Sequence, residues 1–209
     1  GRGSGTMTRP FLLGLTGSIG MGKTTTAQMF ADEGIPVWDA DAAVHRLYTK
    51  GGGAVAAIAA LRPEAVRDGS VDRGALKAWI AGEPSAIGGI EAVVHPLVAA
   101  DRMAFIDGVA RDGAPLVVLD IPLLYETGAD GSVDATIVVT APAGLQRARV
   151  LSRPGMDTAS FEAMLARQLP DVEKRRRARY IVETLTPETA RAQVRAILKD
   201  ITARGVPDA

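Results

Sequence analysis

Cysteine is absent from the sequence, and histidine occurs only twice. Without cysteine the chain has no disulfide, no thiolate nucleophile and no zinc site built from thiolates, which fits a reducing compartment. Two histidines are also too few for a metal centre held by a histidine cluster. On their own, His45 and His95 are interpreted as packing or hydrogen-bonding residues rather than as catalysts.

A net charge is lacking as well, because 24 basic residues balance 24 acidic ones. The chain has no overall electrostatic attraction to nucleic acid or to an anionic membrane, and we expect neither as a partner. A basic run from Lys174 to Arg179 lies beside Asp171 and Glu173, and no aromatic side chains are interleaved with it. We interpret this run as a solvated face.

No apolar run reaches the roughly 18 residues that a membrane-spanning helix needs, and no signal-like segment opens the chain. We therefore expect a cytoplasmic protein. Residues 1–6 precede Met7 and are interpreted as a cloning remnant. Residues 7–209, in a chain with 47% apolar and 23% charged residues, are expected to form one compact enzyme-sized unit.

Five short apolar segments alternate with helical patterns along the chain. The segments are Phe11–Leu15, Ile35–Val37, Leu116–Leu119, Ala135–Val139 and Tyr180–Val182. This alternation predicts an α/β fold in which helices cover both sides of a mostly parallel five-stranded sheet. Ligands of such sheets bind at the carboxyl ends of the strands.

The helical patterns include one long insertion. From Asp41 to about Asp107 the sequence is mostly helical and rich in alanine, with expected breaks at Gly51–Gly53, Asp68–Gly69 and Gly88–Gly89. Further helices are expected from Lys23 to Gly34, over Ala143–Leu151, over Ser160–Gln168 and from Pro187 to Gly205. In the last of these, Thr186 is the expected N-cap, and an apolar stripe is formed by Ala190, Val194, Ile197, Leu198 and Ile201.

A phosphate-binding motif lies between the first predicted strand and the first predicted helix. The segment Gly17–Thr24 has the pattern G-x-x-x-x-G-K-[ST], which needs this strand–loop–helix context. Glycines let successive backbone N–H groups turn toward phosphate oxygens, and the helix start adds partial positive charge. Lys23 suits the β and γ phosphates of ATP, and the hydroxyl of Thr24 suits Mg²⁺. The expected nucleotide-binding set is Gly17, Gly20, Met21, Gly22, Lys23, Thr24, Thr25 and Arg153.

Acidic residues follow two of the predicted strands. Asp39 and Asp41 come after the second strand, where a carboxylate can accept the proton of an attacking hydroxyl or orient that hydroxyl. The alternative is that Asp41 only caps the helix that follows it. Asp120 ends the third predicted strand, and it is either a metal-associated carboxylate or an ordinary turn residue.

Gln146, Arg149 and Arg153 are spaced so that they share one helix face. Arginines arranged in this way can clamp a phosphate chain, because their guanidinium groups stay charged and donate in a planar fork. The alternative is a solvated helix face, since surface arginines are common.

These residues and several short motifs together resemble the dephospho-CoA kinase family. The resemblance runs from about Phe11 to Thr184, and its combination of motifs is more specific than the phosphate loop alone. The motifs are Gly14–Thr24, Asp39-Ala-Asp41, Asp68–Arg73, His95-Pro-Leu97, Pro122-Leu-Leu-Tyr-Glu126 and Gln146–Arg153.

The resemblance implies a fold of the P-loop NTPase type and transfer of the γ-phosphoryl group of ATP, with Mg²⁺, to the ribose 3′-hydroxyl of dephospho-CoA. It also implies a core of residues 11–40, 108–142 and 178–205, a helical CoA-binding subdomain of residues 41–107, and a helical lid of residues 143–173. By motif, Asp41 is the base or orienting carboxylate, Lys23 binds phosphate, and Arg149 is the lid arginine, assisted by Arg153. Asp39, Asp41 and His95 are implied in the substrate site.

One position departs from the family pattern. Where many members carry an asparagine before the last helix, this chain has Thr184. An adenine contact through that asparagine is therefore not expected here, and backbone groups are the alternative.

Two other functions stay open on these residues. One is a different P-loop kinase, acting on a nucleoside monophosphate or a sugar acid. The other is a nucleotide-dependent switch protein, although the chain has no Asn-Lys-x-Asp element for guanine and its helical insertion better suits an acceptor pocket. The oligomeric state also stays open, with a monomer slightly favoured.

Overall fold

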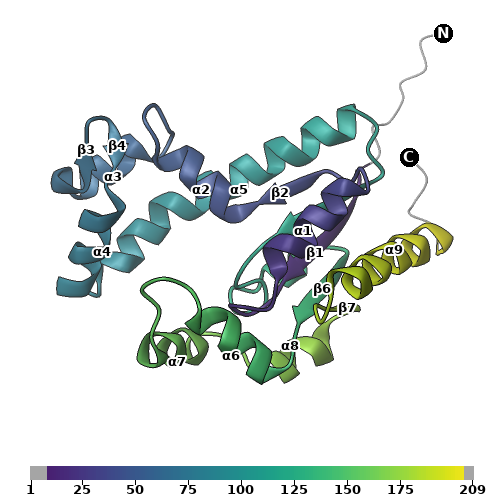
Figure 1. Ribbon diagram of the computed structural model, residues 1–209. Coiled ribbons are helices and arrows are strands. Elements are labelled where there is room, and N and C mark those ends of the chain that lie inside the picture. The colour runs from purple at the N-terminus through teal and green to yellow at the C-terminus, as the bar shows by residue number, and fades with distance from the viewer. Residues whose placement is uncertain (1–8, 205–209) are drawn as a thin grey trace, which may run out of the picture. The chain divides into compact units, whose positions relative to one another are not determined.

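The computed structural model describes residues 9–204, so the interpretation of residues 1–6 and the helix stop expected at Gly205 lie outside the described residues. Within this range the chain forms two compact units (Figure 1). The first contains residues up to 38 together with residues from 106 onward, and the second contains residues 39–105. Over the described residues, none of the helices has the length and apolar character needed to cross a membrane.

The main sheet has five strands in the order β2-β5-β1-β6-β7. Strand β1 pairs in parallel with β5 and with β6, and β6 pairs in parallel with β7. The predicted α/β class and its mostly parallel sheet are therefore confirmed. The strands are β1 (Phe11–Thr16), β2 (Val37–Asp39), β5 (Leu116–Asp120), β6 (Ala135–Thr140) and β7 (Tyr180–Glu183).

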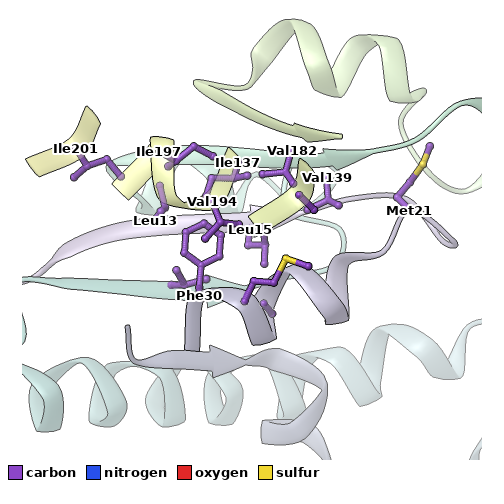
Figure 2. Close-up of a cluster of buried hydrophobic side chains, with 14 of the residues drawn as sticks. Leu13, Leu15, Met21, Phe30, Ile137, Val139, Val182, Val194, Ile197 and Ile201 are labelled. Carbon is purple, nitrogen blue, oxygen red and sulfur yellow. The ribbon is translucent and has the colours of Figure 1, made fainter. Parts of the chain in front are cut away.

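Helices α1 (Lys23–Asp32) and α9 (Pro187–Ala203) pack against each other and against one face of the sheet (Figure 1). Figure 2 shows Phe30 of α1 and Val194 of α9 beside strand residues such as Leu15. In α9 the N-cap predicted at Thr186 is confirmed, and it is part of a capping box in which the Thr186 hydroxyl accepts from the Thr189 N–H and the Thr189 hydroxyl accepts from the Thr186 N–H. The apolar stripe of α9 is buried as its helical spacing predicts.

Replacing Phe30 by alanine is expected to lower the free energy of unfolding by about 3–5 kcal/mol, because the ring is fully buried and its loss leaves a cavity. Urea unfolding followed by circular dichroism measures this change. Gln28→Ala is the control, since Gln28 is exposed on the same helix, and it should change stability by no more than about 0.5 kcal/mol. Equal losses for the two variants would contradict the assignment of this core.

The remaining helices of the first unit follow β6 and precede β7. They are α6 (Ala143–Leu151), α7 (Thr158–Ala166) and α8 (Asp171–Arg177). A short 3₁₀ helix, η2 (Ala129–Ser132), lies between β5 and β6. Helix α8 was not predicted, because its sequence, DVEKRRR, has no apolar periodicity.

The second unit is mostly helical, as predicted, and also contains a small hairpin. Its elements are α2 (Ala40–Tyr48), α3 (Val55–Leu61), η1 (Pro63–Ala65), β3 (Val66–Arg67), β4 (Ser70–Val71), α4 (Arg73–Gly82) and α5 (Ala86–Arg111), the last of which continues into the first unit. The break at Asp68–Gly69 is the hairpin turn, in which both residues have positive φ, of 52° and 78°.

The break predicted at Gly88–Gly89 is wrong. Both glycines lie inside α5, as its third and fourth residues. Farther along the helix, Ile90 and Val94 are buried in the core of the second unit, and this packing outweighs the low helix propensity of glycine.

Candidate active site

The phosphate motif forms a tight loop between β1 and α1. The N–H of Met21 donates to the carbonyl of Ser18 at 3.2 Å, which closes a turn, and the N–H of Thr26 donates to the carbonyl of Gly22 at 3.1 Å, which begins the helix. The Met21 side chain is buried in the core (Figure 2). The backbone of this loop therefore lies at a helix N-terminus, where it favours an anion.

Two glycines of the loop are required by its conformation. Gly20 and Gly22 have φ values of 77° and 90°, in the left-handed region that other residues rarely adopt. A Cβ atom on Gly20 would also lie 2.5 Å from Cγ2 of Val150. One on Gly22 would lie 3.1 Å from the side chain of Thr184. These neighbours, from α6 and from the segment after β7, leave little room for a side chain at either glycine.

The ammonium group of Lys23 forms an ion pair with the carboxylate of Asp120. Asp120 ends β5 and is 2% exposed, so the pair joins the first residue of α1 to the carboxyl end of the neighbouring strand. The sequence placed both residues at this edge of the sheet but did not predict the pair. Thr24 follows Lys23 in the first turn of α1.

Arg149 of α6 lies against the phosphate loop. Its Nη1 atom donates to Oγ1 of Thr184 at 2.9 Å and to the carbonyl of Gly20 at 3.3 Å. Arg149 and Arg153 both line a cavity of about 300 Å³, together with Gly20, Gly22, Thr25, Thr184 and Pro187. The solvated alternative is therefore wrong for Arg149, which is half-buried and hydrogen-bonded to the loop, whereas Arg153 is exposed and borders the cavity without a described contact to the loop.

Gln146 shares this helix face, as its spacing predicted, and it too contacts the loop. Its Nε2 atom donates to the carbonyl of Ile19 at 2.9 Å. The N–H of Ile19 donates in turn to Oε1 of Gln168 at 3.3 Å. No motif in the sequence singled out Gln168, which was expected only as the last residue of a helix and in fact follows α7.

The interpretation of residues 174–179 as a solvated face is wrong for Lys174. This side chain is 1% exposed and forms an ion pair with Glu126 at 3.2 Å. It became buried because α8 returns to the phosphate loop, where Oγ of Ser18 lies 3.4 Å from the lysine Nζ. The neighbouring Arg176 and Arg177 keep the predicted exposure.

Near this pair, Tyr125 forms a buried hydrogen bond with the hydroxyl of Thr136, at 2.7 Å. Burial raises the pKa of the Tyr125 phenol above its ordinary value, so the phenol stays neutral at physiological pH. Tyr125 therefore helps to fix the segment Pro122–Glu126 without adding a charge to it.

Asp39, Asp41 and His95 belong to the second unit. Asp39 is the N-cap of α2, and its Oδ1 atom accepts from the N–H groups of Asp41, at 2.8 Å, and Ala42, at 3.1 Å. The capping role considered for Asp41 is therefore performed by Asp39. Asp41 lies in the first turn of α2 and His95 lies within α5. Their roles toward a substrate stay predictions.

Comparisons with known proteins agree with one another. The family model described as dephospho-CoA kinase matches residues 11–187. A curated dephospho-CoA kinase of Cereibacter sphaeroides is 62% identical over 193 residues, which cover 92% of this chain and 96% of that protein.

Solved structures resemble the chain over most of its length. The crystal structure of TT1252 from Thermus thermophilus has a TM-score of 0.80 at 35% identity and covers 93% of this chain and 99% of its own. A dephospho-CoA kinase from Campylobacter jejuni has a TM-score of 0.64 at 18% identity and covers 92% of this chain and 98% of its own, which shows a common fold. With the phosphate loop in place between β1 and α1, these matches confirm the family expected from the sequence: the chain belongs to the dephospho-CoA kinases, a family of phosphotransferases.

Proposed function

We propose that this chain transfers the γ-phosphoryl group of ATP to the ribose 3′-hydroxyl of dephospho-CoA, giving coenzyme A and ADP. The match with a curated kinase of that name over 92% of the chain carries the proposal. The phosphate loop with Lys23 supports the nucleotide half of the reaction, because it places a helix N-terminus and a lysine together. The absence of cysteine supports a reducing, cytoplasmic setting.

The cavity beside the loop suits part of the ATP molecule next to its phosphates. Its lining combines the flat guanidinium groups of Arg149 and Arg153 with the apolar ring of Pro187. Thr184, where the expected family pattern has asparagine, donates its hydroxyl to the carbonyl of Met21 and accepts from Arg149. We infer that Thr184 shapes the loop and positions Arg149, and that backbone groups of the segment after β7 recognise the base.

Mg²⁺ fits the oxygen donors near the loop. Thr24 has a hydroxyl and Asp120 a carboxylate, and Mg²⁺ prefers such oxygen ligands and shares them with nucleotide phosphates. Over the described residues no group of three or more His, Cys, Asp or Glu residues could hold a metal by itself. A bound Mg²⁺ would offset charge on the phosphates during transfer, with Thr24 as its ligand and Asp120 associated with it.

The protein's own contribution is then positioning and charge stabilisation. Lys23 binds the β and γ phosphates, and Arg149, with Arg153, stabilises the charge that spreads over the transferring group. Residues 143–173 act as a lid over the phosphates, and residues 41–107 bind the CoA moiety. Asp41 accepts the proton of the 3′-hydroxyl or orients that group, and Asp39 and His95 contribute to the acceptor site.

Incubation with Mg-ATP and a panel of acceptors tests this function. The panel contains dephospho-CoA, nucleoside monophosphates, and sugar acids such as gluconate. We expect a product from dephospho-CoA alone, with the new phosphate on the 3′-oxygen when mass spectrometry and phosphorus NMR are used to locate it. Phosphorylation of a different acceptor would establish another small-molecule kinase. ATP hydrolysis with no phosphorylated acceptor would favour a switch protein.

A further inference from the structure

Side chains from one segment, residues 146–174, contact the phosphate loop at Ser18 and Ile19. Both backbone polar groups of Ile19 are bound to glutamine side chains, the carbonyl to Gln146 and the N–H to Gln168. The preceding loop residue, Ser18, is 4% exposed, and its hydroxyl lies 3.4 Å from the Nζ atom of Lys174. Because the carbonyl of Ser18 closes the turn of the loop, these contacts fix the turn at its base.

Glu126 connects the contacts into a closed network. Its Oε2 atom lies 3.2 Å from Nζ of Lys174 and accepts from the N–H of Leu169 at 3.1 Å. Leu169 follows Gln168 in the chain. One oxygen of Glu126 therefore contacts both Lys174, which lies beside Ser18, and the backbone next to Gln168, which binds Ile19. The other oxygen, Oε1, is buried and has no hydrogen-bond partner within the described residues.

The Lys174–Glu126 ion pair is expected to add little net free energy to the stability of the fold. Lys174 is 1% exposed, and the cost of removing an ion pair from water commonly cancels the attraction between its charges. An apolar pair of similar size would stabilise the fold at least as well. The pair instead fixes the relative positions of the groups that it joins, since an ammonium group donates hydrogen bonds to a carboxylate and a hydroxyl at defined positions.

We propose that Glu126 and Lys174 are positioning residues of the phosphate loop. They hold Ser18 and, through Gln168, Ile19 in the conformation that binds the phosphates of ATP. The inference rests on the proposed function, since it assigns these residues to the ATP site of the same reaction. Its consequence is selective: loss of the pair weakens ATP binding and raises the KM for ATP, while the KM for dephospho-CoA stays unchanged.

Lys174→Met tests the proposal in the full-length protein. Methionine keeps the length of the side chain and removes the charge, and we expect calorimetric ATP affinity to fall about tenfold, the effect of losing one well-placed hydrogen bond. Lys174→Arg keeps a cation and should recover part of that loss. Glu173→Gln is the matched control, because Glu173 is the preceding residue of α8 and pairs with the exposed Arg176 and Arg177. The control should bind ATP as the unchanged protein does.

A second variant separates positioning from folding. The double variant Lys174→Met/Glu126→Gln contains no unpaired buried charge, so its melting temperature should rise above that of Lys174→Met. Continued weak ATP binding in this stabilised variant would support positioning. Recovery of ATP affinity together with the melting temperature would show a structural role alone and overturn the proposal. A failure of the proposed function looks different, because the unchanged protein would then not phosphorylate dephospho-CoA at all.

Discussion

Turnover of dephospho-CoA is expected to fall about a hundredfold or more when Asp41 is replaced by asparagine, the typical contribution of a general base. Asparagine is close in size but cannot accept the proton of the 3′-hydroxyl. ATP affinity should stay nearly intact, because the proposed role of Asp41 concerns the acceptor alone. Steady-state kinetics with both substrates and calorimetric titration with ATP measure the two effects separately.

The N-terminus of α2 stays capped when Asp41 is replaced, because the cap is Asp39. A loss of turnover would therefore not come from an uncapped helix. Asp32→Asn is a matched control, since Asp32 is an exposed carboxylate at the end of α1 that pairs with Arg191 at 3.4 Å. That control should retain full turnover. Unchanged turnover in Asp41→Asn would remove Asp41 from the mechanism.

Replacing Arg149 by alanine is expected to lower kcat about a hundredfold, the usual effect of removing one donor that stabilises developing charge. The affinity for ATP should fall much less. Arg149→Lys keeps the charge but loses the planar fork, in which Nη1 donates to the Thr184 hydroxyl and Nη2 to the Thr184 carbonyl, so it should recover little activity. Single-turnover measurements at saturating ATP give the rate of transfer free from binding effects.

Arg147 provides the matched control for this experiment. It lies on the same helix, is exposed, and donates to Oγ1 of Thr158 at 3.4 Å. Arg147→Ala should leave kcat unchanged. If Arg149→Ala reduced only ATP affinity, with full turnover at saturation, the assignment of Arg149 to charge stabilisation would be refuted. Melting temperatures of both variants show whether the loop contacts of Arg149 also support the fold.

The sheet and its connecting helices could be predicted because their sequence patterns are local. Strands β1, β5 and β6 are nearly continuous apolar runs, as buried parallel strands require, and α9 has both its cap and its stripe in the sequence. Helix α8 could not be predicted, since seven mostly charged residues form a helix here through contacts with distant parts of the chain. The helix start that includes Gly88 and Gly89 depends in the same way on packing farther along α5.

The candidate site likewise contains residues that could be predicted from the sequence and residues that could not. The phosphate loop, Lys23 and Arg149 have fixed spacing or a helical period that the sequence displays. Lys174 and Glu126 lie 48 positions apart and become partners only when α8 packs beside the loop. A lysine in a run of basic residues gives no sign that it is buried, because burial depends on a carboxylate supplied by another element.

The contact between Lys23 and Asp120 sets a condition on nucleotide binding. An incoming phosphate does not meet a solvated ammonium group, because that group already has an anionic partner in the protein. The ammonium group has three donors, so a phosphate shares it with the carboxylate, and the electrostatic gain is smaller than for an unpaired lysine because the carboxylate repels the phosphate. The same carboxylate keeps the lysine in place before a nucleotide arrives, and it disfavours a singly charged anion, whose attraction to the lysine is offset by repulsion from Asp120.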